Sequence, residues 1–168
     1  MEHVDPIART HRTLTDPLDR FQVLGDRCSG TNYISHLIDQ NFPSLTPSQE
    51  LGWKHGFIDR RVAGSPGLLT AVVYRHPVRW MQSFHRNPFQ LSKAMTELDF
   101  SDFIRANWEP VWFKKSDDGA TFEEPIQGEM YPHSTRRFEN ICRMRSTKIT
   151  YLEELSSLPS QVVFLNYE

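Results

Sequence analysis

Apolar runs alternate with amphipathic stretches along the chain, and this alternation predicts where strands and helices lie. Phe21–Leu24 predicts the first strand, and Leu68–Tyr74 is an almost continuous run of apolar and β-branched residues. Such a run is typical of a strand that is buried on both faces, as in a parallel sheet. Gln161–Tyr167 predicts another strand of this buried type.

Helices are predicted by apolar residues that recur on one helix face and by residues that suit helix ends. Thr31–Asn41 carries Ile34 and Ile38 at helical spacing. Pro77 suits the first turn of a helix that we expect to extend to about Arg86.

The second half of the chain carries weaker signals. Ser101 is a suitable N-cap for a helix that continues through Trp108, and His133–Leu155 is the longest helical stretch. Three more segments complete the prediction: a short strand at Leu51–Phe57, a helical turn at Ile58–Gly64 and a long surface loop at Lys114–Pro132.

Strands that alternate with helices predict an α/β fold with three α/β/α layers and a mostly parallel central sheet. We expect a single domain over residues 1–168, with 1–20 as a loose N-terminal lead-in. Ligands of such sheets bind at the carboxyl ends of the strands. Three groups of residues would share that edge: Gly25–Asn32, Lys54 with His55, and Arg75.

Composition and charge narrow the classes of partner. The 19 basic and 21 acidic residues give a formal net charge of −2, so we expect no nucleic-acid partner, and any anion site must be local. No stretch approaches the ~20 apolar residues of a membrane span, and the N-terminus lacks the apolar core of a signal peptide. Cys28 and Cys142 make no disulfide framework, so we expect a reduced, cytoplasmic setting.

The Gly25–Asn32 loop joins a predicted strand to a helix N-terminus. Free backbone N–H groups and the positive end of the helix dipole meet at such a junction and can bind a phosphate. Gly25 and Gly30 match the start of the P-loop nucleotide-binding pattern, but Thr31 stands where that pattern has a lysine. The loop is therefore either a phosphate loop or a glycine-rich turn without a ligand.

Two further groups follow predicted strands. Arg75 and Ser83 are spaced so that a guanidinium and a hydroxyl could reach one anion; alternatively they are a surface arginine and a neutral helix position. His55 is a candidate general base or a structural histidine, and Lys54 beside it is a candidate anion ligand or a solvated charge. We expect no metal, because no spacing of histidine, cysteine and carboxylates resembles a zinc site.

The order of these segments resembles the sulfotransferase family, whose members use 3′-phosphoadenosine 5′-phosphosulfate (PAPS) as donor. The resemblance rests on RCSGTN, WKHGF, VVYRHPVRWMQSFHRNPF and VVFLNYE, and covers roughly residues 20–168. It implies a P-loop type of α/β fold and transfer of a sulfuryl group to a hydroxyl or amine of a small molecule or carbohydrate. It also implies a set of cofactor-binding residues: Arg27, Cys28, Ser29, Gly30, Thr31 and Asn32 for the 5′-phosphosulfate, and Arg75 and Ser83 for the 3′-phosphate.

The same resemblance implies the catalytic residues. His55 would take the proton of the acceptor, and Lys54 and Arg27 would neutralise the charge that develops on the leaving phosphate. The family continues beyond the position of Glu168 with a basic, glycine-containing segment. A minimal form, a fragment and a degenerate relative are therefore all consistent with the sequence.

Two other classes of function stay open. The first is a P-loop kinase or NTPase, which Thr31 and the lack of a metal-binding carboxylate after the Leu68–Tyr74 run disfavour. The second is a non-catalytic nucleotide-binding fragment. The sequence leaves the acceptor and the oligomeric state open.

Overall fold

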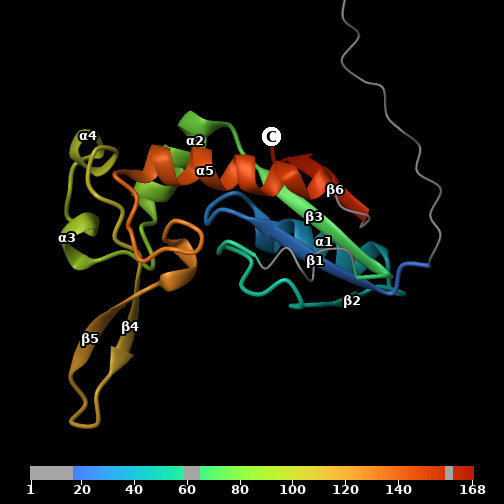
Figure 1. Ribbon diagram of the computed structural model, residues 1–168, viewed down its shortest axis with the longest axis horizontal. Coiled ribbons are helices and arrows are strands. Elements are labelled where there is room, and N and C mark those ends of the chain that lie inside the picture. The colour runs from blue at the N-terminus through green and yellow to red at the C-terminus, as the bar shows by residue number, and fades with distance from the viewer. Residues whose placement is uncertain (1–16, 59–64, 158–160) are drawn as a thin grey trace, which may run out of the picture.

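The structure is a computed structural model that describes residues 17–58, 65–157 and 161–168. At its centre, strands pair in the order β2-β1-β3-β6, and each of these pairs is parallel (Figure 1). β1 spans Arg20–Gly25, β3 spans Leu68–Tyr74 and β6 spans Gln161–Asn166, whereas β2 is only Thr46–Pro47.

Over the residues that the structure describes, three helices of ten or more residues accompany the sheet: α1 at Thr31–Asn41, α2 at Pro77–Arg86 and α5 at Ile141–Glu153. The short elements are α3 at Lys93–Thr96, α4 at Phe100–Phe103, and two 3₁₀ turns, η1 at Gln127–Glu129 and η2 at Glu154–Ser157. β4 (Val111–Lys115) and β5 (Thr121–Pro125) form an antiparallel hairpin that projects away from the sheet (Figure 1).

Alternate side chains of the central strands pack against helices on opposite faces of the sheet. On one face Val23 packs in a cluster with Ile38 of α1. On the other face Leu24 packs in a cluster with Leu152 of α5. The predicted α/β fold, with a parallel central sheet flanked by helices, is confirmed at this level.

A third apolar cluster, rich in aromatic rings, lies among α2, α4 and the start of α5. Trp80 and Phe84 of α2 and Phe103 of α4 are at most 1% exposed. Trp108 and Ile141 are equally buried there. The loop after β1 packs against this cluster.

The elements with strong end signals agree with the sequence prediction. The bounds of α1 and β3 are those expected, and α2 begins at Pro77 and ends at Arg86. β1 extends one residue beyond the predicted strand at each end. The helical turn predicted at Ile58–Gly64 lies almost wholly outside the described residues, as does most of the lead-in.

Five predicted segments are corrected by the structure. Leu51–Phe57 contains turns and no strand. The helix expected from Ser101 to Trp108 is instead the single turn α4, which begins before Ser101 because the Asp99 side chain accepts the capping hydrogen bond. The long loop at Lys114–Pro132 instead contains most of the β4–β5 hairpin and η1.

The fourth correction concerns α5, which begins at Ile141 and not at His133 because the Asn140 side chain caps its first turn.

The fifth correction concerns β6, which is a strand as predicted but is not of the buried type. Its pairing is to β3, and Val163 and Phe164 are 41% and 40% exposed. Its apolar run therefore belongs to a partly exposed strand that pairs with β3, and not to a strand that is buried on both faces.

Candidate functional site

The Gly25–Asn32 loop begins at the carboxyl end of β1 and ends in the first turn of α1. Cys28 has φ 61° and Gly30, the N-cap residue of α1, has φ 92°. No side chain of the described residues caps this helix. Left-handed residues at a helix N-terminus turn successive N–H groups toward one point, which is the geometry of an anion site.

Lys54 and His55 are tied to this loop. The Gly25 N–H donates to the Lys54 carbonyl at 3.0 Å, and His55 Nδ1 lies 2.7 Å from the Gly25 carbonyl oxygen. The Lys54 ammonium donates to Asn32 Oδ1 in the first turn of α1. The two segments that the sequence placed at one edge are therefore in direct contact.

Arg75 and Ser83 reach the same loop through Cys28. Arg75 Nη1 donates to the Cys28 carbonyl at 3.1 Å, and the Cys28 thiol hydrogen-bonds with the Ser83 side chain. Burial raises the pKa of the Cys28 thiol despite that hydrogen bond and the nearby Arg27 and Arg75 charges. The thiol is thus a neutral part of the loop.

Tyr167 and Glu168, which follow β6, lie over this edge. Glu168 Oε1 accepts from Arg75 Nε at 3.2 Å and lies 3.8 Å from Arg79 Nη1. A Cβ added to Gly30 would come 2.3–2.7 Å from atoms of the Tyr167 ring. A glycine is therefore needed at position 30 both for its backbone conformation and for this close ring contact.

Within the loop, the side chain of Arg27 points away from the predicted phosphate position. It is 2% exposed, donates to the Gln90 carbonyl at 2.9 Å and forms an ion pair with Glu129. Its Cζ also lies 5.1 Å from the Phe84 ring centre and 5.3 Å from that of Trp108. The expected roles of Arg27 in cofactor binding and catalysis are therefore corrected: its charge is already paired in the interior.

Two more residues of the loop are turned inward. The buried Ser29 hydroxyl donates to the Asp26 carbonyl at 2.5 Å, and the Ser29 N–H donates to the same oxygen at 3.2 Å. Thr31 is also buried, at 5% exposure. Cys28 and Gly30 are partly exposed and Asn32 is exposed, so these residues form the accessible rim of the loop.

Beneath the loop lies a buried charge cluster, in which each residue is 6% exposed or less: Asp26, Arg27, Glu129, Arg145 and Lys148. Lys148 Nζ donates to Glu129 Oε1 at 2.9 Å and to the His55 carbonyl at 2.7 Å, and lies 3.2 Å from Asp26 Oδ1. Burial by itself would raise the pKa of Glu129, but Arg27 and Lys148 lower it overall. Three cations face two carboxylates, so the buried charge cluster carries one excess positive charge beneath the loop.

His55 is neutral in this setting. Burial lowers its pKa to about 4, and the charges of Lys148, Lys54 and Arg27 act in the same direction. The Gly25 carbonyl can only accept, so the neutral ring carries its proton on Nδ1 and leaves Nε2 as an acceptor. This is the tautomer that a general base at Nε2 requires.

The structure brings together four of the predicted groups: Lys54, His55, Arg75 and the loop with Ser83 beside it. Sequence reasoning missed the partners beneath them. A signal existed for two, because Ile141, Met144, Arg145, Lys148 and Leu152 recur at helical spacing and form the buried stripe of α5. Glu129 follows a hairpin that itself was missed, and it had no such signal.

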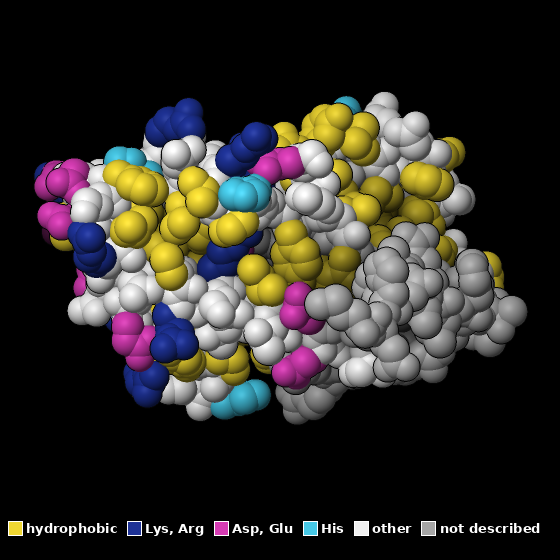
Figure 2. All heavy atoms as spheres, turned by 90° about the horizontal axis from the view of Figure 1, so that it is seen from above, with side chains coloured by type: hydrophobic (Ala, Val, Ile, Leu, Met, Phe, Trp, Pro, Cys, Tyr) yellow, Lys and Arg dark blue, Asp and Glu magenta, His cyan; other side chains and the backbone are white. Residues whose placement is uncertain are grey.

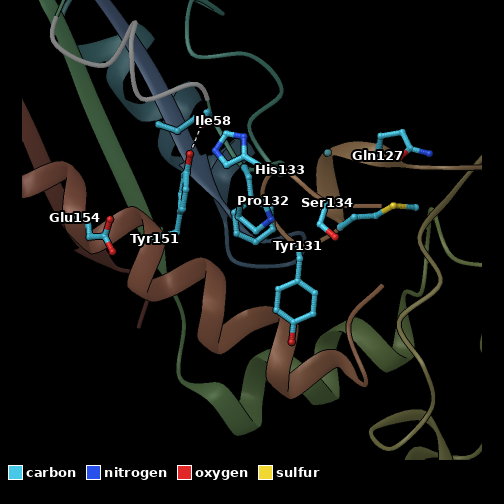
Figure 3. A pocket seen from close by; sticks show the side chains of 11 residues that line it. Ile58, Gln127, Tyr131, Pro132, His133, Ser134, Tyr151 and Glu154 are labelled. Carbon is cyan, nitrogen blue, oxygen red and sulfur yellow. Dashed lines mark hydrogen bonds between the residues drawn. The ribbon is translucent and has the colours of Figure 1, made fainter. Parts of the chain in front are cut away.

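A large cavity lies beside α5, apart from the loop. It has a volume of about 960 Å³, and its lining includes Phe57, Tyr131, His133, Tyr151 and Glu154. In Figure 3, Tyr151 and Glu154 come from α5 and η2, and the segment with Pro132 and His133 lies across from Tyr151. None of the residues that line it belongs to the Gly25–Asn32 loop, so it is not the predicted phosphate position.

Three further observations concern the surface charge, metal ligands and membrane-spanning helices. On the described part of the face seen from above, basic side chains are scattered and several lie beside acidic ones, so this face shows no single basic field (Figure 2). Among the described residues, no three histidine, cysteine or carboxylate side chains gather as metal ligands. Nor does this part of the chain contain a helix with the length and apolar character needed to cross a membrane.

Comparison with known proteins finds no match to a family model, to a curated protein or to a solved structure.

Proposed function

We propose that this chain is a P-loop type sulfotransferase, which moves a sulfuryl group from PAPS to a hydroxyl or amine acceptor. The observation that carries the proposal is the convergence at one sheet edge of an uncapped α1 N-terminus, the Lys54 ammonium and the Arg75 guanidinium. These are three kinds of donor that bind phosphate or sulfate oxygens. Arg75 already contacts one carboxylate, that of Glu168, and this contact supports the proposal that the edge binds anions.

Two anionic groups of the donor would be bound by different parts of this edge. The N–H groups at the start of α1, from Gly30 to Asn32, would hold the 5′-phosphosulfate beside Lys54. Arg75 and Ser83, which meet at Cys28, would hold the 3′-phosphate. The excess positive charge of the buried charge cluster would favour both anions.

In the proposed reaction an acceptor oxygen attacks sulfur as the bond from sulfur to the bridging phosphate oxygen breaks. His55 Nε2 takes the acceptor proton, and 3′-phosphoadenosine 5′-phosphate leaves with the bonding electron pair. Lys54, which donates to Asn32 in the first turn of α1, would neutralise the charge that grows on the leaving phosphate. Arg27 takes no part, since its guanidinium is paired with Glu129.

The test is to follow formation of 3′-phosphoadenosine 5′-phosphate from PAPS with a panel of sugars, alcohols and amines. We expect product only with a suitable acceptor, and a His55→Ala variant slower by roughly 10²–10⁴. Turnover of ATP with Mg²⁺ in place of PAPS would support the kinase or NTPase alternative. Binding of PAPS without transfer to any acceptor would favour a non-catalytic binding protein.

A further inference from the structure

The geometry points to Glu168 as a residue that sets the affinity and selectivity of the anion site, by acting as an internal competitor for the 3′-phosphate. Its Oε1 accepts from Arg75 Nε at 3.2 Å and lies 3.8 Å from Arg79 Nη1. The side chains of Arg75 and Glu168 are 23% and 18% exposed, so the pair is partly shielded from solvent. The inference rests on the proposed function, because it assigns Arg75 to the 3′-phosphate.

The position of Glu168 is defined by its neighbours. The Tyr167 N–H donates to the Tyr74 carbonyl at 2.8 Å, which continues the pairing of β6 with β3. The Tyr167 ring lies against Gly30 and makes an edge contact with Tyr33 at 5.8 Å. Arg75 Cζ is 5.6 Å from the same ring. Glu168 is thus held at the guanidinium by backbone and ring contacts.

Arg75 is itself positioned independently of Glu168. Its Nη1 donates to the Cys28 carbonyl at 3.1 Å, so the guanidinium keeps a partner when the carboxylate leaves. A 3′-phosphate must replace the Glu168 carboxylate at Arg75 Nε. Its net gain in binding free energy is therefore the difference between the contact of Arg75 with phosphate and the contact of Arg75 with the carboxylate. A nucleotide without a 3′-phosphate leaves that ion pair intact.

The experiment is calorimetric titration of the full chain and its Glu168→Gln variant with 3′-phosphoadenosine 5′-phosphate and with AMP. Glutamine keeps the shape and removes the competing charge. We expect affinity for 3′-phosphoadenosine 5′-phosphate to rise by about 3- to 10-fold, because the variant removes the stabilisation of a partly exposed ion pair that the ligand must otherwise displace. Affinity for AMP should stay unchanged. Glu97→Gln is the matched control, because it removes the same charge from an exposed pair with Lys93.

The outcomes separate this inference from the proposed function. If both chains bind 3′-phosphoadenosine 5′-phosphate equally, Glu168 is no competitor, while the proposed nucleotide site stands. An equal rise for AMP would likewise overturn the inference, since it would reflect general charge. Binding seen only in the Glu168→Gln variant would support both proposals, and no binding in either chain would overturn both.

Discussion

At the residue scale, His55 shows how burial sets the chemistry of a side chain. Its ring hydrogen-bonds with the Gly25 carbonyl and makes an edge contact with the Trp53 indole, whose ring centre is 5.4 Å away. The lowered pKa keeps the ring neutral, so Nε2 is free of a proton over the whole physiological range. The same low pKa makes the imidazole a weaker base than a free histidine.

The histidine also links stability to pH. The unfolded chain takes up a proton at His55 below its ordinary pKa of 6.5, whereas the folded chain does so only near 4. The contribution of His55 is therefore complete above pH 6.5 and is lost as the pH falls toward 4, at up to about 1.4 kcal/mol per pH unit.

A His55→Gln variant should lose this part of the pH dependence. Its side-chain amide can still donate to the Gly25 carbonyl but does not titrate. Urea unfolding of both chains from pH 7 to pH 4 measures the difference, and the parent should lose stability more steeply. Parallel curves would mean that His55 is as solvated in the folded chain as in the unfolded one.

At the scale of the elements, α5 connects the core to the site. Its buried stripe begins with Ile141 and Met144 in the aromatic cluster and ends with Leu152 on the sheet. Between them, Arg145 donates to the Arg75 carbonyl and Lys148 to that of His55. One helix thus holds both the turn segment that contains His55 and the residue that follows β3 at the sheet edge.

We predict that Lys148→Met destabilises the fold by about 3–5 kcal/mol, the range for removing one partner of a buried ion pair. The reason is that Glu129 and the His55 carbonyl would each lose a donor in the interior. Arg143→Met on the exposed face of the same helix is the control and should change stability by about 0.5 kcal/mol or less. Equal effects of the two changes in urea unfolding would show that the buried charge cluster adds no stability.

The helices and strands also show which parts of the fold can be predicted from the sequence. α1, β3 and α2 were predictable because apolar periodicity and end residues such as Pro77 point to the same bounds. The β4–β5 hairpin was missed because Lys114–Pro132 is polar and punctuated by glycine and proline, whereas pairing of Lys114 opposite Phe122 forms it. Cross-strand side-chain pairing decides such segments, and composition alone does not reveal that pairing.

For the candidate site, the parallel strands β1 and β3 were enough to bring the Gly25–Asn32 loop and Arg75 to one edge. Lys54 and His55 also reach this edge, but through a turn segment that the sequence wrongly predicted as a strand. The direction of a single side chain was not predictable. Arg27 lies within the predicted phosphate loop, yet its guanidinium lies among Phe84, Trp108 and Glu129. That outcome depends on a carboxylate 102 residues away along the chain.

At the scale of the whole molecule, the parallel sheet, the aromatic cluster and the buried charge cluster converge on one edge. The sheet supplies the ends of β1 and β3, and α1 directs its N-terminus to the same place. The formal charge of the chain is −2, so attraction of an anion depends on this local arrangement. The central claim is that the edge binds a nucleotide with phosphates at both the 5′ and the 3′ positions.

Calorimetric titration of an Arg75→Ala variant with 3′-phosphoadenosine 5′-phosphate and with AMP tests that claim most directly. The variant should lose ~1.5–3 kcal/mol of binding free energy for the first ligand, the range for a hydrogen bond to a charged group, and little for AMP. Arg86→Ala, an exposed arginine at the end of α2, should behave as the parent with both ligands. Equal losses for the two ligands, or no binding of 3′-phosphoadenosine 5′-phosphate by either the parent chain or the Glu168→Gln variant, would contradict the account.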